Sequence, residues 1–168
     1  MAVHRSRELN YTKNDMRYWL FKSEPSTFSI DDCASRPKKT EHWDGVRNYQ
    51  VRNLLRDEIK KGDQAFFYHS SCEIPGIAGI VEIVREGYPD FTAWDPLSDH
   101  FDPKSTSENP RWYMVDVKFI QKFPRIISLE ELKKHPRLEN MPVVRRGNRL
   151  SITPVTAKEW EIILKFVK

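Results

Sequence analysis

The sequence contains few of the residues from which disulfide scaffolds, zinc sites and membrane spans are built. Its 168 residues include only two cysteines, Cys33 and Cys72, too few for a disulfide framework or a cysteine-rich zinc site. No stretch approaches the roughly 20 apolar residues of a membrane span, and the first residues lack the apolar core of a signal peptide. We therefore expect no membrane partner and a location in the cytoplasm, or in the nucleus if the source is eukaryotic.

Glycine-rich nucleotide-binding motifs are also absent. The six glycines form neither a Gly-x-Gly-x-x-Gly turn nor a P-loop. The five histidines are scattered along the chain without the spacing of zinc ligands. These absences argue against an enzyme that depends on a dinucleotide or ATP, and we expect neither a cofactor nor a metal ion.

Aromatic residues, in contrast, are abundant. They make up 12% of the chain, and a hydrophobic content of 39% is enough for a core of its own. The net charge of +4 permits a polyanion as partner without requiring one. Residues 1–16 show no periodicity and are predicted to form a loose tail, so residues 17–168 are interpreted as one domain, which we expect to be a monomer.

The hydrophobic pattern predicts an α+β domain, with locally paired strands and helices inserted between them. The strands are expected to form a small mixed or antiparallel sheet. The expected elements are a strand at 17–23, a helix at 30–35 capped by Ser29, a helix after the cap Asn48, neighbouring antiparallel strands at 64–70 and 77–86, a long loop at 89–110, a strand at 111–123, a helix at 129–135 opened by a capping box at Ser128, a strand at 150–152, and a terminal helix capped by Thr156.

The most unusual segment surrounds Trp43, which precedes the turn signal Asp44-Gly45 and lies outside any periodic apolar face. Two interpretations fit this position. Trp43 either plugs an edge of the sheet or offers a stacking surface to a planar ligand. Arg47 and Asn48 follow at a predicted helix N-terminus, where backbone donors and the helix dipole favour an anion such as phosphate.

Two polar clusters stand at predicted strand ends. Lys22 and Ser23 end the first strand, and Tyr68, His69 and Ser70 follow an apolar run. A tyrosine there can stack on a base, while a histidine and a serine can form hydrogen bonds with the edge of the base. Solvated turns and capped strand ends have the same composition, so both interpretations stay open.

A thiol chemistry has to be considered beside these clusters, because Cys72 is close to His69 in the sequence. A cysteine–histidine pair can activate a thiolate nucleophile. However, no third orienting group or oxyanion loop is identifiable, and the segment matches no hydrolase motif. A Cys/His hydrolase or a nucleic-acid-modifying enzyme is therefore the alternative to a non-catalytic binding protein, and an adaptor that binds protein is a third reading.

The densest positive stretch contains Arg145, Arg146 and Arg149. Charge runs of this kind are usually solvated faces. The same residues can also form a rim that follows the phosphates of a nucleic acid, and its affinity would then fall steeply with salt.

Several motifs together resemble the EVE domain family, in order from Arg17 to Lys168. They are residues 18–25 (YWLFKSEP), 43–49 (WDGVRNY), 66–70 (FFYHS), 75–79 (PGIAG), 109–112 (NPRW), 115–117 (VDV) and 149–152 (RLSI). The resemblance implies a PUA-like fold, a compact β-barrel flanked by helices. It also implies non-catalytic binding of DNA or RNA that carries a modified base, such as 5-methylcytosine or 5-hydroxymethylcytosine.

This resemblance, combined with the clusters above, yields a hypothesis for the site: one aromatic pocket that holds a base, with cations around it for phosphates. The expected aromatic surfaces are Trp43, Tyr68 and Trp94, the last of them in the long loop. The expected base-edge contacts are Ser23, Asn48, His69 and Ser70. The expected phosphate contacts are Lys22, Arg47, Arg145, Arg146 and Arg149.

Overall fold

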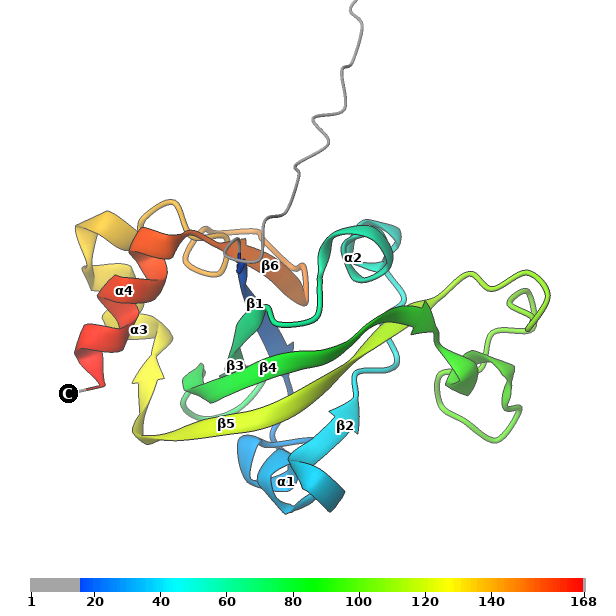
Figure 1. The fold of residues 1–168 in the computed structure, drawn as a ribbon. Coiled ribbons are helices and arrows are strands. Elements are labelled where there is room, and N and C mark those ends of the chain that lie inside the picture. Colours follow the sequence, from blue (N-terminus) through cyan, green and yellow to red (C-terminus); the bar gives the residue numbers. More distant parts are fainter. Residues whose placement is uncertain (1–15, 168) are drawn as a thin grey trace, which may run out of the picture.

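An open, six-stranded mixed sheet forms the centre of the computed structural model, which describes residues 16–167 (Figure 1). The predicted tail at 1–16 therefore lies, apart from Met16, outside the described residues. The strands are β1 (Tyr18–Ser23), β2 (Thr40–His42), β3 (Gln64–His69), β4 (Gly76–Pro89), β5 (Tyr113–Ser128) and β6 (Ile152–Val155). The helices are α1 (Ile30–Ser35), α2 (Tyr49–Asn53), α3 (Leu129–Lys134) and α4 (Ala157–Phe166). The α+β prediction is confirmed.

The sheet has two free edges. Its strand order is β2-β5-β4-β3-β1-β6, and within residues 16–167 no pairing joins β2 to β6. Closing a barrel requires the two outer strands to pair along their length, and these strands have only 3 and 4 residues. The prediction of a closed β-barrel is therefore not confirmed.

The helices of the described residues are short, and none of them combines the length and the apolar character that a membrane span requires.

Local capping signals were reliable. Ser29, Ser128 and Thr156 cap their helices as predicted, and all three form a capping box, which had been predicted only at Ser128. The Asn48 side chain accepts a hydrogen bond from Val51 N, as expected of a cap. The antiparallel pairing of β3 with β4 is also confirmed. The short polar strand β2 had no pattern by which it could be found.

The strand boundaries differ from the prediction most clearly at β5 and β6. β5 continues to Ser128, beyond the expected end at Phe123. The strand tolerates Pro124 because its register with β4 shifts between Lys122 and Ile127, where a ladder donor is not needed. β6 begins at Ile152, where the prediction placed a strand end.

The sheet has a hydrophobic cluster on each face, and strand alternation assigns the aromatic residues to them. In β3, Phe67 packs into one cluster with Phe21 and Trp43, whereas Tyr68 packs into the other with Trp160. Successive side chains of a strand point to opposite faces. The rings of Trp43 and Tyr68 therefore lie on opposite sides of the sheet.

The carboxyl ends of β1 and β3 lie next to each other, because these two strands are parallel and pair Ser23 with His69. Only β1 and β3 are paired in parallel in the described sheet, and this pairing joins segments far apart in the sequence. It brings the end of β1 to the region where β2 and the Trp43 segment also arrive.

Candidate functional site

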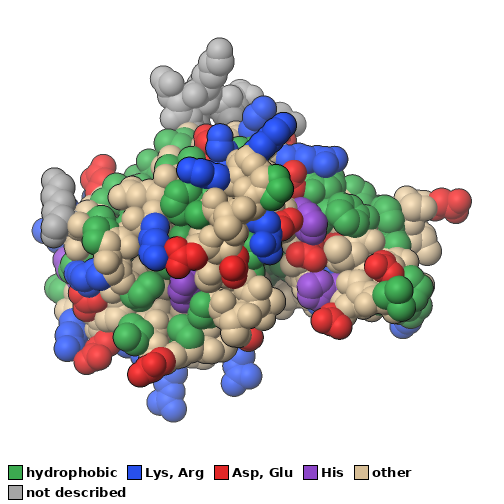
Figure 2. All heavy atoms as spheres, turned by 90° about the horizontal axis from the view of Figure 1, so that it is seen from below, with side chains coloured by type: hydrophobic (Ala, Val, Ile, Leu, Met, Phe, Trp, Pro, Cys, Tyr) green, Lys and Arg blue, Asp and Glu red, His purple; other side chains and the backbone are tan. Residues whose placement is uncertain are grey.

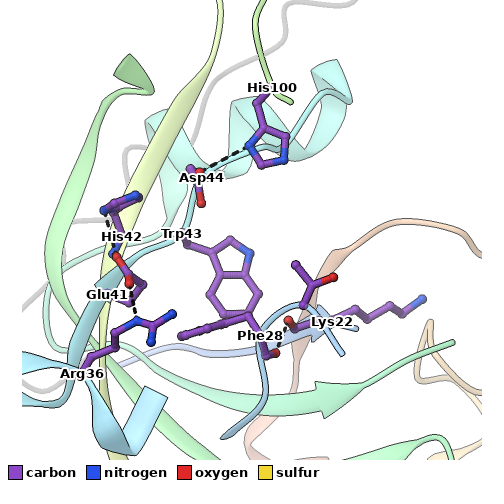
Figure 3. A pocket seen from close by; sticks show the side chains of 10 residues that line it. Lys22, Phe28, Arg36, Glu41, His42, Trp43, Asp44 and His100 are labelled. Carbon is purple, nitrogen blue, oxygen red and sulfur yellow. Dashed lines mark hydrogen bonds and ion pairs between the residues drawn. The ribbon is translucent and has the colours of Figure 1, made fainter. Parts of the chain in front are cut away.

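A pocket of about 380 Å³ lies where the end of β1 meets β2 and the Trp43 segment (Figure 3). Its walls come from four separate parts of the chain. The lining residues are Lys22, Ser23, Thr27, Phe28, Arg36, Glu41, His42, Trp43, Asp44 and His100. The volume is in the range of small-ligand pockets, roughly 300–1,000 Å³.

Trp43 belongs both to the core and to the pocket wall. Only 8% of the residue is exposed. Its ring packs edge-to-face against Phe21 and Phe67, with ring centroids 5.1 and 5.5 Å apart, and its backbone N donates to Val115 O over 2.8 Å. Figure 3 shows the indole between Asp44 and Phe28, against the pocket. The two interpretations of Trp43 are therefore compatible, since one face of the hydrophobic cluster ends at the ligand-sized cavity.

Charged side chains of both signs are interspersed over the face of the molecule shown in Figure 2. On the pocket rim, most charges are paired. The Glu41 carboxylate accepts a hydrogen bond from Arg36 Nε at 2.7 Å and lies 3.0 Å from His42 Nδ1. Asp44 Oδ2 lies 3.3 Å from His100 Nδ1. Lys22 differs, since within residues 16–167 no ion pair joins it to a carboxylate. Its pKa lies below the usual lysine value because the amine is partly desolvated by burial. An anionic group of a ligand would compensate the Lys22 amine for the hydration that it loses by burial.

The long loop between β4 and β5 contributes His100 to the pocket and is held by a buried carboxylate. Asp90 is 1% exposed and accepts hydrogen bonds from Gly45 N at 2.9 Å and from Arg47 Nη1 at 3.0 Å. The Arg47 guanidinium also donates to His100 O over 2.5 Å. Arg47 therefore fixes the loop against the Trp43 segment.

Gly45 makes this contact possible. Its φ of +81° is in the left-handed region, and a Cβ atom there would lie 2.5 Å from the His100 ring. Only glycine adopts that conformation without strain and leaves this space. The turn signal Asp44-Gly45 thus has a second role, which is to let the imidazole pack on the backbone beside Trp43.

Three of the predicted site residues line the pocket, namely Lys22, Ser23 and Trp43. The Ser23 hydroxyl donates to Phe28 O over 2.6 Å and so orients the opposite wall. Arg47 does not line the pocket because its guanidinium is engaged with Asp90 and His100.

The other predicted residues lie outside the pocket lining. Tyr68 is buried on the opposite face of the sheet, where burial raises its pKa to about 12. The Asn48 side chain caps α2, and the backbone N of Ser70 donates a hydrogen bond to the backbone O of Ser23. Trp94 lines a separate hollow of about 320 Å³ within the loop. Arg145, Arg146 and Arg149 are exposed, and their contact with nucleic acid stays a prediction.

Several pocket residues had not been predicted. Phe28 and Arg36 flank α1, and His100 is in the middle of a loop without periodicity, so no local pattern marks them. Asp44 and His42 were within the unusual Trp43 segment, and that segment was the one signal available. Convergence of these residues depends on the parallel pairing of β1 with β3 and on the docked loop.

His69 has a structural role that makes stability depend on pH. Its Nε2 accepts a hydrogen bond from Ile30 N at 3.1 Å, which requires this nitrogen to be unprotonated. Burial lowers the pKa of His69 from its ordinary value of 6.5, and the nearby Asp31 offsets this only in part. Below pH 6.5 the unfolded chain therefore takes up a proton that the folded chain resists, so stability is lost as pH falls.

Acidification from neutral pH to a pH below the folded-state pKa of His69 lowers the free energy of unfolding of the wild type. We expect this decrease to be smaller in His69→Gln, because glutamine keeps a hydrogen-bond acceptor but takes up no proton. Urea titrations at the two pH values measure the difference. An identical acid-induced loss in both proteins would contradict the hydrogen-bonded neutral imidazole.

The thiol alternative has no geometric support in the described residues. No hydrogen bond joins Cys72 to His69 in residues 16–167. Burial raises the pKa of the Cys33 thiol to about 11, which is the opposite of an activated thiolate. Within the same residues, no group of three or more histidine, cysteine or acidic side chains is arranged to hold a metal ion.

Comparison with known proteins decides the family. The EVE domain profile matches residues 17–166, which is nearly the whole chain. The chain belongs to the EVE domain family. The predicted resemblance is therefore confirmed.

This EVE domain has relatives in animals, fungi and bacteria. It is 50% identical over 133 residues to human thymocyte nuclear protein 1, a match covering 74% of this chain and 59% of that protein. It is 42% identical to the uncharacterized protein C21.03c of Schizosaccharomyces pombe, over 90% of this chain and 69% of that protein. The matched region thus spans about three fifths of the human relative.

Solved structures agree with this fold. A protein of Pseudomonas putida superimposes with a TM-score of 0.86 at 48% identity, covering 90% of this EVE domain and 99% of that chain. The human THYN1 protein in complex with DNA containing 5-methylcytosine has a TM-score of 0.84 at 45% identity, covering 90% and 98%. None of the relatives described above has the name of an enzyme.

Proposed function

We propose that this EVE domain binds nucleic acid and holds one modified base, of the 5-methylcytosine or 5-hydroxymethylcytosine kind, in the Trp43 pocket. The observation that carries the proposal is a nucleobase-sized cavity in a domain of this family, with an aromatic wall and a lysine, Lys22, that forms no ion pair within residues 16–167. The relative solved with DNA containing 5-methylcytosine supports the choice of ligand.

The pocket offers the interactions that an extruded base requires. A base that leaves its stack loses a few kcal/mol, and stacking on an aromatic side chain returns roughly 1–3 kcal/mol. Trp43 and Phe28 supply aromatic surface, and Asp44 is the group placed to accept a hydrogen bond from the amino group of cytosine. Thymine has a carbonyl at that position, so Asp44 would disfavour it.

The cations around the pocket suit a phosphate backbone. Lys22 lies on the rim, and its backbone N donates to Ser151 O over 2.8 Å. The chain that follows Arg149 therefore runs directly beside Lys22. Phosphates on either side of the bound base can be neutralised by Lys22 and by the exposed arginines at 145, 146 and 149.

A panel of short oligonucleotides that differ only in one base tests the function. One buried methyl group is worth about 0.8 kcal/mol, so we expect roughly fourfold tighter binding of a 5-methylcytosine strand than of the unmodified strand. Fluorescence anisotropy at several salt concentrations measures both the preference and the number of phosphate contacts. Equal affinity for modified and unmodified strands would refute base reading, and no measurable binding of either would refute nucleic-acid binding.

A further inference from the structure

Arginines and aromatic rings form a column beside the pocket that the function proposed above does not use. The guanidinium carbon of Arg47 lies 5.3 Å from the Trp112 ring, and Trp112 stacks on Tyr49 with ring centroids 4.9 Å apart at 27°. The guanidinium carbon of Arg52 lies 4.9 Å from the Tyr49 ring. The order along the column is therefore Arg47, Trp112, Tyr49 and Arg52.

The inner end of this column meets the pocket wall. Arg47 donates to the carbonyl of His100, and the His100 side chain lines the pocket. Trp112, 5% exposed, is fixed by the hydrogen bond from its Nε1 to Asp102 Oδ2 at 2.7 Å. These contacts make the inner half of the column rigid and continuous with the site.

The outer end is open to a ligand. Tyr49 is 52% exposed, which is unusual for a ring that stacks on a buried tryptophan. Within residues 16–167 the Arg52 guanidinium donates to Asn53 Oδ1 and Arg111 O, both neutral acceptors, and no carboxylate forms a direct ion pair with it, although its charge helps to lower the pKa of Asp57.

We propose that Tyr49 and Arg52 bind the nucleotide that flanks the base in the Trp43 pocket, on the same strand. A flanking base stacks on the tyrosine ring or the guanidinium plane, and the charge of Arg52 meets the adjoining phosphate. This inference rests on the proposed function and extends it, because it makes the ligand a strand and not a free nucleotide. The segment from Trp43 to Tyr49 would then carry both contacts at its two ends.

Two probes separate the flanking contact from the pocket. The first is 5-methyl-2′-deoxycytidine monophosphate, with binding followed by NMR, and the second is a short single strand with one central 5-methylcytosine. We expect Tyr49→Ala to weaken binding of the strand about tenfold, the effect of one lost stacking contact, without changing binding of the mononucleotide. Tyr49→Phe keeps the ring and should bind the strand as the wild type does.

Arg52→Gln tests the charge, with Arg137→Gln as the matched control. Arg137 is an exposed arginine that follows α3, and Figure 1 shows α3 at the left of the view, away from α2, which contains Tyr49 and Arg52. Arg52→Gln should reduce the salt dependence of strand binding by about one phosphate contact, and Arg137→Gln should not. The thermal unfolding midpoint of each variant checks that the domain is folded at the binding temperature.

The outcomes are distinct. If the wild type prefers the modified strand while Tyr49→Ala and Arg52→Gln bind it as Arg137→Gln does, the flanking contact is refuted and the proposed function survives. If Tyr49→Ala weakens the mononucleotide as much as the strand, Tyr49 acts through the pocket and the inference is also refuted. If the wild type binds neither probe, both proposals fail.

Discussion

Trp43→Ala is expected to lower the free energy of unfolding by about 3–5 kcal/mol, the usual cost of removing a large buried aromatic side chain. The ring is 8% exposed and contacts Phe21, Phe28 and Phe67, with centroid distances of 5.1, 6.0 and 5.5 Å. Native domains have roughly 5–15 kcal/mol in total, so this loss is a large part of the stability. Urea denaturation at neutral pH measures it, and a variant as stable as the wild type would contradict the packing described above.

Trp43→Phe separates the structural role of this ring from its role in binding. Phenylalanine keeps an aromatic group against Phe21 and Phe67 but offers a smaller stacking surface to a base. We expect most of the stability to be retained, while the preference for a modified strand falls markedly. If both variants, assayed below their unfolding midpoints, keep the wild-type preference, Trp43 is not the wall on which the base stacks.

Asp90→Ala is expected to be about as destabilising, by roughly 3–5 kcal/mol, because it removes the fully buried carboxylate of an ion pair and leaves two backbone amides and the partly buried guanidinium of Arg47 without their acceptor. The Asp90 side chain is fully buried, and its carboxylate accepts hydrogen bonds from Gly45 N, Thr92 N and Arg47 Nη1. The same change should release the loop that carries His100. Nucleic-acid binding at the pocket should therefore weaken together with stability, measured by oligonucleotide affinity and by urea denaturation.

A matched control and a pH titration make this prediction specific. Asp99→Asn, an exposed site in the same loop, should leave the free energy of unfolding within about 0.5 kcal/mol of the wild type. Burial alone would raise the pKa of Asp90, but hydrogen bonds from Thr92, Gly45 and Arg47 outweigh burial and hold it below its ordinary 3.8. The stability from the ionised carboxylate is thus present above pH 3.8 and lost as pH falls through the folded-state pKa. Equal losses for Asp90→Ala and Asp99→Asn would contradict the role of this ion pair.

Arg47 lies between the Trp43 pocket and the proposed flanking site, and its role differs from the predicted one. The sequence placed this residue among the phosphate contacts because it precedes a helix. In the structure α2 has only five residues, its free amide at Val51 is capped by Asn48, and Arg47 is bound to Asp90 and His100. The charge of Arg47 therefore holds the loop, whereas Arg52, five residues further along the chain, forms no direct ion pair within residues 16–167 and can contact a ligand.

Much of the fold could be predicted from local sequence patterns, such as capping residues and turn segments. Capping residues such as Ser29 and Thr156 mark helix starts because their side chains bond to amides only three residues away. The antiparallel pair β3 and β4 could be predicted because its strands are joined by a short turn. Family membership was likewise readable, since motifs such as 43–49 retain their order and spacing.

The composition of the site was decided by tertiary structure. Local sequence shows that Phe67 and Tyr68 are on one strand, but which of them shares a face with Trp43 depends on the partner elements that cover each face. Phe28, Arg36 and His100 converge on the pocket because β1 and β3 pair in parallel and because Asp90 anchors a loop to Gly45. The sequence by itself determined most of the elements and their caps, which depend on residues close in the chain, and the family, which depends on the order of short motifs along the whole domain. Only the folded chain decided which aromatic rings and cations meet, because those contacts join segments tens of residues apart.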